Sequence, residues 1–272
     1  MKSNTLTVNK DGSLMYITFP RLSGCGVVRH TFSTKLGGVS KGKYGEMNLS
    51  FNRGDEREAV EQNYKILCDA VGIDVSHLVL SHQTHTNNVR VVTRSDCGTG
   101  YNLPPFKDVD GLITNESGVA LVTQYADCTP LLFCDPKKRV IATSHAGWRG
   151  TVKEIGRVTV EKMQSEFGCC PEDIIAAIGP CIKQCCYEVD TPVFNEFKRL
   201  SLDMEKIFVQ TDSEHYMLDL VEANRQILIK SGIKPENIDA SDICTNCNSD
   251  KLHSHRASNG ERGNLAAIIE LI

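Results

Sequence analysis

The stretch that decides the fold is residues 108–151, DVDGLITNESGVALVTQYADCTPLLFCDPKKRVIATSHAGWRGT. It contains three short apolar runs, at 119–125, 130–134 and 140–143, separated by polar joints. Runs of this length and composition predict buried strands whose ends lie at one edge of a sheet. Reactive residues of α/β proteins are concentrated where strands end, so we expect a catalytic or binding site at this edge.

Composition limits the class of protein. The chain has 272 residues, of which 40% are hydrophobic and 24% charged, as in a soluble globular protein with a sizeable core. No repeat, low-complexity tract or linker interrupts it, which favours one domain over residues 1–272. The net charge of −4 and the pI near 6.1 give no electrostatic reason to expect nucleic acid as a partner.

The apolar segments are all too short for a membrane. None approaches the roughly 20 residues that a transmembrane helix needs, so no membrane partner is expected. The first residues, MKSNTLTVNKDGS, lack the apolar centre of a signal peptide, which predicts a cytoplasmic protein. For such a protein the 12 cysteines predict reduced and mostly buried thiols rather than a disulfide framework.

Further elements follow from the spacing of apolar residues. Strands are predicted at 13–19, 27–32, 78–81, 89–93, 173–178 and 265–272, and helices at 55–71, 151–167, from 191, and at 217–230. Asp55 and Thr191 are expected to cap the first and third helices, and Gly72 and Gly168 to end the first two. The glycine-rich loop 33–48, with Lys35, is interpreted either as a solvated loop or as a flap over an anionic ligand.

Two kinds of site are compatible with the central stretch. His85, Cys128 and His145 are a candidate metal site of nitrogen and sulfur ligands with an open fourth position, as in catalytic zinc centres. Cys128 with His145 as its base is equally a candidate nucleophile pair, and spacing does not separate the two hypotheses. The glycine-flanked turn at Arg149 predicts an anion site, for phosphate included, at a helix start.

A third candidate lies near the C-terminus, where Cys244-Thr-Asn-Cys247 precedes His253 and His255. Only five residues separate Cys247 from His253, against about a dozen or more in the usual structural zinc units. We therefore favour thiols packed beside a site over a structural metal built from these four residues.

The motifs HQTHTNNV, DVDGLIT, ADCTPLLF, HAGWRGT, IGPCI with YEV, and CTNCN with HSHR occur in this order along the chain. In this the chain resembles the bacterial polyphenol-oxidase or laccase-domain family, from about residue 30 to the C-terminus. The resemblance implies a single α/β domain, with central mixed sheets flanked by helices in an α/β/β/α-type sandwich. It also implies a zinc-dependent purine nucleoside phosphorylase acting with phosphate on adenosine, inosine, guanosine and 5′-methylthioadenosine, and deamination of adenosine to inosine.

Carried over residue by residue, the resemblance makes His85, Cys128 and His145 the metal ligands. For deamination, in which a zinc-activated water attacks C6 of adenine, we expect Asp110 or Glu188 to shuttle the proton. The remaining candidates for catalysis and substrate binding are Lys35, Asn48, Arg149 and Arg256. The chain departs from the family pattern at two positions. At the first, Lys35 replaces an arginine, and a lysine cannot bind phosphate with two parallel donors. At the second, the family's Gly-Arg pair is replaced by Gly263-Asn264, and Arg262 lies one residue earlier.

Other functions remain as alternatives at this stage. A Cys128/His145 hydrolase or deamidase is one, because the family is distantly related to deamidating toxins. A copper-dependent polyphenol oxidase is another, although only eight histidines are available and copper would more simply occupy the zinc site. The partners expected are purine nucleosides and phosphate, for a protein that is a monomer or a weak homo-oligomer. A nucleotide sensor on a retired active site is the non-enzymatic alternative.

Overall fold

The central stretch of the sequence contributes strands to two different sheets. The computed structural model describes residues 1–272, and in it β8 (Ala120–Tyr125) belongs to a seven-stranded sheet. The next two strands, β9 (Thr129–Asp135) and β10 (Val140–Ala146), pair antiparallel in a six-stranded sheet. The chain crosses from one sheet to the other at residues 126–128, so the expectation of a single sheet edge is wrong.

Both sheets contain parallel and antiparallel pairs. The strand orders are β1-β2-β3-β16-β8-β4-β6 and β15-β11-β9-β10-β7-β5. In the first sheet the other strands are β1 (Thr7–Asp11), β2 (Leu14–Thr18), β3 (Val28–Ser33), β4 (Leu78–His82), β6 (Phe106–Lys107) and β16 (Leu265–Leu271). In the second they are β5 (Val89–Val91), β7 (Gly111–Thr114), β11 (Ile175–Ile178) and β15 (Ile238–Ala240). The strands predicted from β-branched runs are confirmed, whereas β1, β6, β7 and β15 were not predicted.

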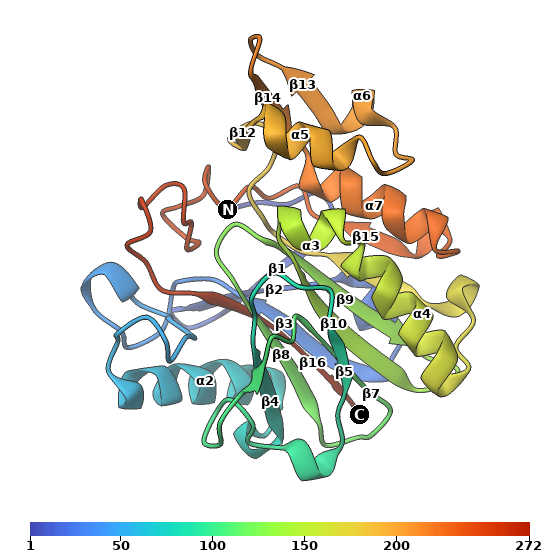
Figure 1. The fold of residues 1–272 in the computed structure, drawn as a ribbon. Coiled ribbons are helices and arrows are strands. Elements are labelled where there is room, and N and C mark those ends of the chain that lie inside the picture. Colours follow the sequence, from blue (N-terminus) through green and yellow to red (C-terminus); the bar gives the residue numbers. More distant parts are fainter.

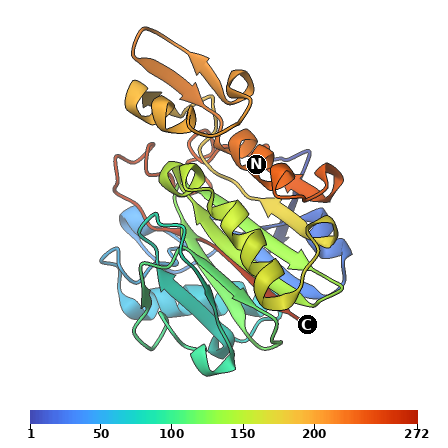
Figure 2. The same ribbon diagram turned by 45° about the vertical axis from the view of Figure 1, so that its right-hand side comes forward.

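The sheets pack face to face and carry helices on their outer faces, as Figures 1 and 2 show. α2 (Arg57–Val71) lies on the seven-stranded sheet and shares a core with β4, β8 and β16. α4 (Ile155–Phe167) and α7 (Leu220–Lys230) cover the six-stranded sheet. A third apolar cluster, with Leu121 of β8 and Leu132 of β9, fills the space between the sheets. The predicted α/β/β/α arrangement of mixed sheets flanked by helices is confirmed.

The helix beyond the central stretch begins earlier than predicted and is broken. α3 (Trp148–Val152) starts directly after Gly147 and is one turn long. The chain then turns at Glu154, whose φ of 52° is left-handed, before α4 begins. Gly168, with φ of 65°, ends α4 as predicted.

Two helix caps differ from the prediction. Glu56 occupies the N-cap position of α2, while the Asp55 carboxylate accepts hydrogen bonds from Ser40 Oγ and Asn48 Nδ2. In α5 (Thr191–Phe197), the cap is Asp190, which accepts from Val193 N at 3.2 Å. Gly72 ends α2 in the left-handed conformation as predicted. A short polar side chain therefore stands near each helix start, but local spacing did not identify which one caps it.

A small subdomain projects from the sandwich at the top of Figure 1. It contains a three-stranded sheet of β12 (Glu188–Asp190), β14 (His215–Leu218) and β13 (Phe208–Gln210), with α5 and α6 (Met204–Ile207). Its own apolar cluster includes Phe197 and Phe208. The helix predicted at 217–230 is therefore wrong at its start, since β14 ends at Leu218 and the Asp219 side chain caps α7.

The remaining helical segments are short. They are α1 (Pro20–Gly24), η1 (Gly42–Tyr44), η2 (Val75–His77), η3 (Arg94–Asp96), η4 (Pro171–Asp173) and η5 (Pro235–Asn237). None of the helices is both long enough and apolar enough to cross a membrane.

We expect His30 in β3 to make folding sensitive to acid. Its side chain is 5% exposed and its Nε2 accepts a hydrogen bond from Phe19 N at 2.9 Å, so burial lowers the pKa of His30 to about 4. Between pH 6.5 and 4 the unfolded chain binds the proton that the folded chain excludes, so stability present near pH 7 is lost as the pH falls. From pH 7 to pH 5 this histidine should lower the free energy of unfolding by about 2 kcal/mol.

Urea unfolding of the wild type and of His30→Gln at both pH values measures this effect. The glutamine keeps an acceptor for Phe19 N but does not titrate, so the variant should lose less stability on acidification than the wild type. Equal losses in both proteins would contradict the assignment.

Candidate active site

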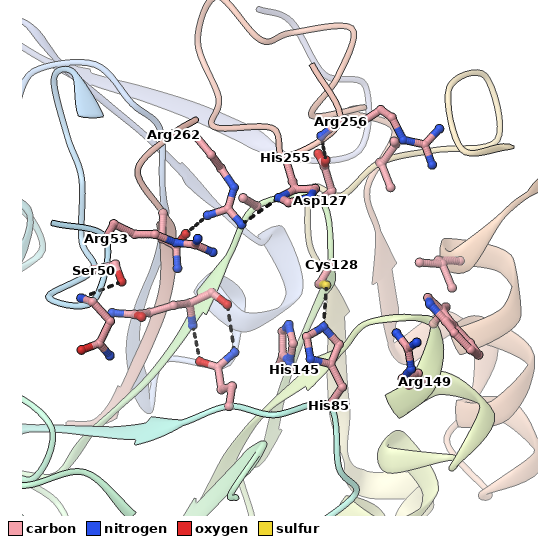
Figure 3. Close-up of a pocket in the computed structure, with 18 of the residues that line it drawn as sticks. Ser50, Arg53, His85, Asp127, Cys128, His145, Arg149, His255, Arg256 and Arg262 are labelled. Atoms are coloured by element: carbon pink, nitrogen blue, oxygen red, sulfur yellow. Dashed lines mark hydrogen bonds between the residues drawn. The ribbon is translucent and has the colours of Figure 1, made fainter. Parts of the chain in front are cut away.

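Three side chains converge where the chain crosses between the sheets. His85 lies in the loop after β4, Cys128 directly precedes β9, and His145 is in β10. Their donor atoms all lie within 4.8 Å of one another, and His85 Nε2 is 3.8 Å from Cys128 Sγ. The two imidazole rings meet edge to face, with centroids 4.8 Å apart. Figure 3 shows both rings directed toward the sulfur.

The fully buried carboxylate of Asp110 holds both histidines. Its Oδ1 lies 2.9 Å from His145 Nδ1, which leaves His145 Nε2 as the ring nitrogen available to the site. The same oxygen accepts from His85 N at 3.0 Å, and Oδ2 accepts from Thr84 N and Thr86 N. One carboxylate thus orients His145 through its ring and His85 through its backbone.

The backbone at the site is specialised in two places. His85 has φ of 64°, a left-handed conformation that costs a non-glycine residue free energy and is held here by the bonds to Asp110. A Cβ at Gly147 would lie 2.8 Å from His85 Cδ2 and 2.9 Å from Cys128 Sγ. The close approach of the three donors therefore requires glycine at position 147.

The charges of the three buried groups support one another. Burial alone would raise the pKa of Asp110, but the hydrogen bonds from His145 and Thr86 outweigh it and hold the pKa at about 2. Burial likewise opposes ionisation of Cys128 and His145, yet each is the other's charge partner. The pKa of the Cys128 thiol is lowered by His145 and His85, and the pKa of His145 is raised by Cys128 and Asp110. Without a metal, the geometry favours a thiolate beside an imidazolium.

The donor set fits a catalytic metal ion such as zinc. Two imidazole nitrogens and a thiolate are ligands that zinc prefers, and three protein ligands with an open position are typical of catalytic sites. Asp110 supplies the carboxylate–histidine contact that fixes the ring of a metal ligand. Gly147 leaves the space beside the donors that any side chain would fill.

The three donors open into a cavity of about 770 Å³. Its lining is mostly polar, with apolar surface from Ala126, Trp148, Ile182, Tyr187 and Leu220. Polar residues from five separate segments complete the wall, namely Ser50, Asn52, Arg53, Ser81, His82, Gln83, Gln124, Asp127, Arg149, His255, Arg256, Arg262 and Asn264. A cavity of this size suits a small molecule such as a nucleoside.

Two arginines, Arg53 and Arg262, stand together on one wall of the cavity (Figure 3). Arg262 is 8% exposed and its guanidinium donates to Asn264 Oδ1 and Gly263 O, while its buried Nε has no partner. Burial, together with repulsion from Arg53, lowers the pKa of Arg262 to about 10. Neither arginine forms a salt bridge with a carboxylate, so this wall is ready to accept an anion.

The other predicted residues lie in different surroundings. Arg149 lines the cavity with its guanidinium 4.3 Å from the centre of the Trp148 ring. Arg256 lines it as well, but its guanidinium donates to Cys186 O and Glu188 O. Lys35 and Asn48 are not in the lining. Lys35 donates to Ser249 O, and the buried Asn48 accepts from Ser50 N and Asn264 N.

The two acidic residues predicted to shuttle a proton, Asp110 and Glu188, both lie outside the cavity lining, and Asp110 contacts His145 Nδ1 instead.

The structure also identifies residues that the sequence did not predict. Asp127 is the acidic residue in the cavity wall. Arg53 was not singled out, because a lone arginine in a loop carries no local signal. Arg262 was noted only as standing one step from a family arginine. Cys244 and Cys247 group with Cys185 and Cys186 rather than with His253 and His255.

The structure contains no second group of histidines that could bind several copper ions. The close groups of three or more histidine, cysteine or acidic donors are the His85 group and a cluster of four cysteines. His30 and His77 are engaged elsewhere, with Phe19 N and Glu270. The histidine-rich set that several copper ions need is therefore not assembled.

The fold and the site together define a mixed α/β protein with a buried His-Cys-His centre open to a polar cavity. The chain belongs to the family described as multi-copper polyphenol oxidoreductase laccase, which matches residues 29–272. It is 39% identical to the purine nucleoside phosphorylase YlmD of Bacillus subtilis (strain 168), over 88% of this chain and 86% of the relative.

Two more relatives describe the range of the family. The adenosine deaminase RL5 of an unknown prokaryotic organism is 33% identical over 83% of this chain and 87% of its own. The crystal structure of the Bacillus licheniformis hypothetical protein YfiH superposes with a TM-score of 0.91 and 32% identity. It covers 97% of this chain and 99% of that one. The resemblance expected from the sequence motifs is confirmed, and the relatives are named for two different reactions.

Replacing Asp110 by asparagine should weaken metal binding. The amide would present a donor to the His145 ring or to the backbone amides of 84–86, so the orientation of both histidines would be lost. We expect the affinity for zinc to fall by about 10–100-fold, as for other residues that orient metal ligands. Competition with a chromophoric chelator measures the affinity directly.

The matched control is Asp108→Asn, since Asp108 bonds to Thr84 Oγ1 in the same loop but contacts neither ring. Its affinity for zinc should stay near that of the wild type. Unchanged affinity in a folded Asp110→Asn protein would remove Asp110 from the account of the site.

Proposed function

We propose that the protein is a zinc-dependent purine nucleoside phosphorylase that also deaminates adenosine. The observation that carries the proposal is the His85, Cys128 and His145 donor group, which opens into a cavity of about 770 Å³. The names of the relatives support both reactions. The proposed substrates are adenosine, inosine, guanosine and 5′-methylthioadenosine, each with phosphate. We also propose one domain over residues 1–272, acting in the cytoplasm as a monomer or weak homo-oligomer.

His85 Nε2, Cys128 Sγ and His145 Nε2 are the atoms that would hold the metal ion. When bound there, zinc supplies a Lewis acid that lowers the pKa of a water molecule toward neutrality. Copper binds such ligands more tightly, so it would compete for the same position. Asp110 is buried and bonded on both oxygens, so in this proposal it positions His145 rather than carrying a proton to substrate.

We assign phosphate to the wall formed by Arg53 and Arg262, beside His255. The Arg53 guanidinium has no hydrogen-bond partner, whereas Lys35 and Arg256 donate to backbone carbonyls. Arg262 donates to Gly263 O and Asn264 Oδ1, but its charge faces no carboxylate in a salt bridge. In phosphorolysis a phosphate oxygen bonds to C1′ of the ribose while the bond from C1′ to the base breaks. The base leaves with the bonding electrons and takes up a proton. Arg149 is another cation in the lining and would stabilise the negative charge that develops on the leaving base.

The apolar part of the wall suits the purine. Trp148 and Tyr187 offer flat surfaces against which a base can stack. Ser81 Oγ lies in the lining, buried and without a hydrogen-bond partner, and the amides of Gln83 and Gln124 are close in the same wall. The Gln83 amide is bonded at both ends to the Gln124 backbone, so Ser81 Oγ and Gln124 Oε1 are the groups free to pair with the polar edge of a base or with ribose hydroxyls.

A cysteine hydrolase or deamidase is the second candidate. The specific observation in its favour is that Cys128, His145 and Asp110 lie in a row in the structure. This arrangement matches a nucleophile, its base and a residue that orients the base. In this case amide hydrolysis would persist after metal removal and stop after alkylation of Cys128.

Incubation with adenosine distinguishes the activities. Adenine and ribose 1-phosphate formed only with phosphate indicate phosphorolysis, and inosine formed without phosphate indicates deamination. Cys128→Ala should lower both activities by at least about 100-fold, because it removes a ligand and the charge partner of His145. Chromatography of the products, with zinc content measured in parallel, provides the test.

The matched control is Cys170→Ala, an exposed cysteine outside the cavity. It should retain wild-type turnover. If Cys128→Ala lost zinc but kept full adenosine turnover, the proposed metal mechanism would be wrong.

The phosphate assignment predicts a selective effect of Arg53→Gln. Arg53 is exposed at the cavity wall, so its loss should leave the fold intact while removing charge-assisted hydrogen bonds to phosphate. We expect the KM for phosphate in phosphorolysis to rise by about 10-fold or more, with little change in deamination. Steady-state kinetics at varied phosphate measure this, with the exposed Arg199→Gln, two residues beyond the end of α5, as the control. Equal losses in both reactions would contradict the assignment.

A further inference from the structure

Four cysteines form a second cluster, apart from the His85 group. They are Cys185, Cys186, Cys244 and Cys247, and their sulfur atoms all lie within 4.8 Å of one another. Cys247 Sγ is 3.6 Å from Cys185 Sγ and 3.3 Å from Cys186 Sγ. No cysteine in the chain forms a disulfide.

The backbone brings these thiols together by two turns. In the first, Cys186 N and Tyr187 N both donate to Lys183 O at 2.9 Å, so adjacent cysteines share one turn. In the second, Asn248 N donates to Cys244 O at 3.1 Å and closes the loop around Cys247. A β-bridge between Cys181 and Cys244 joins the two turns. Neither turn depends on a bond between the sulfur atoms.

The distances fit tetrahedral coordination better than sulfur–sulfur bonding. With zinc–sulfur bonds of about 2.3 Å, the sulfur atoms of a tetrahedral site are separated by about 3.8 Å. The observed separations of 3.3 and 3.6 Å are close to this value. A disulfide would need about 2.05 Å. Lys183 N also donates to Cys244 Sγ at 3.5 Å, a contact that supports a metal-bound thiolate.

We propose that these four cysteines bind a structural zinc ion, distinct from the metal of the active site. Four thiolates without nitrogen or oxygen ligands select a soft ion, and a closed four-ligand set is typical of structural zinc. The Cys244-Thr-Asn-Cys247 segment is one half-site, and the vicinal pair Cys185-Cys186 supplies the other.

The position of the cluster indicates what the ion would hold. The first turn leads directly into Tyr187, and the second leads into the segment with His255, Arg256 and Arg262, all in the cavity lining. Arg256 crosses between them and donates to Cys186 O at 3.2 Å. Zinc would therefore join two loops that have no extended strand pairing and fix one wall of the active-site cavity.

Metal counting tests the proposal. Protein produced with added zinc and purified under reducing conditions should contain two zinc ions per chain by mass spectrometry of the metal. Cys128→Ala should contain one, and the double variant Cys244→Ser with Cys247→Ser should also contain one. The exposed Cys170→Ser serves as the matched control and should contain two. Wild-type protein with one ion that is lost entirely in Cys128→Ala would overturn the proposal.

A second measurement does not depend on the double variant folding. Cys128→Ala loaded with cobalt(II) retains only the cysteine cluster, so a strong sulfur-to-cobalt charge-transfer band is expected in the near ultraviolet. Its absence would overturn the proposal, as would an intact mass showing these cysteines paired as disulfides in protein purified without oxygen. Cys128 is not part of the cluster. Either result therefore leaves the proposed nucleoside activity untouched, and that activity is tested separately by the products formed from adenosine.

Discussion

The hydrogen bonds of the Asp110 carboxylate are the interaction on which the active site depends. Asp110 lies directly before β7, is fully buried, and accepts from the ring of His145 and from the backbone of residues 84–86. A buried charge is costly unless it is paired and bonded, so the surrounding donors must stay in place. Their geometry in turn fixes His85 in a left-handed conformation that the loop would not otherwise adopt. One carboxylate thereby converts two distant histidines into a pair with a defined separation.

The crossing between the sheets explains why Cys128 completes this pair. β8 belongs to one sheet and β9 to the other, so the connecting residues 126–128 lie at the end of the sandwich where both sheets contribute side chains. Pro130 of β9 pairs with His145 of β10, which places the cysteine close to that histidine. The apolar cluster between the sheets therefore shapes the candidate site as well as the core, because it sets the spacing of the strands beside the three donors.

Local patterns in the sequence predicted the elements better than their assembly. The apolar runs of β8, β9, β10 and β16 and the glycine ends of α2 and α4 were sufficient to predict them. Which sheet each strand joins depends on pairing between distant residues, and the short strands of the small subdomain carry too few residues for a period. The resemblance made His85 a ligand, and no local pattern separates it from His82 three residues earlier, because the contact that orients His85 comes from the distant Asp110. Arg53, Arg262 and the four-cysteine cluster arise from loops that meet only in the folded chain.

Asp127 links the His85, Cys128 and His145 donor group to the wall of the cavity that carries Ile182 and Arg256. Its φ is 83°, and its carboxylate accepts from Thr245 Oγ1 at 2.6 Å and from Arg256 N at 2.7 Å. Its carbonyl accepts from Ile182 N at 3.0 Å, in the segment that leads to the vicinal cysteines. Because Asp127 precedes Cys128, a displacement of either loop must act on the backbone that positions this sulfur. The wall proposed to contact substrate is therefore joined to the donor group through one residue, and constraints on the loops also constrain the position of Cys128 Sγ.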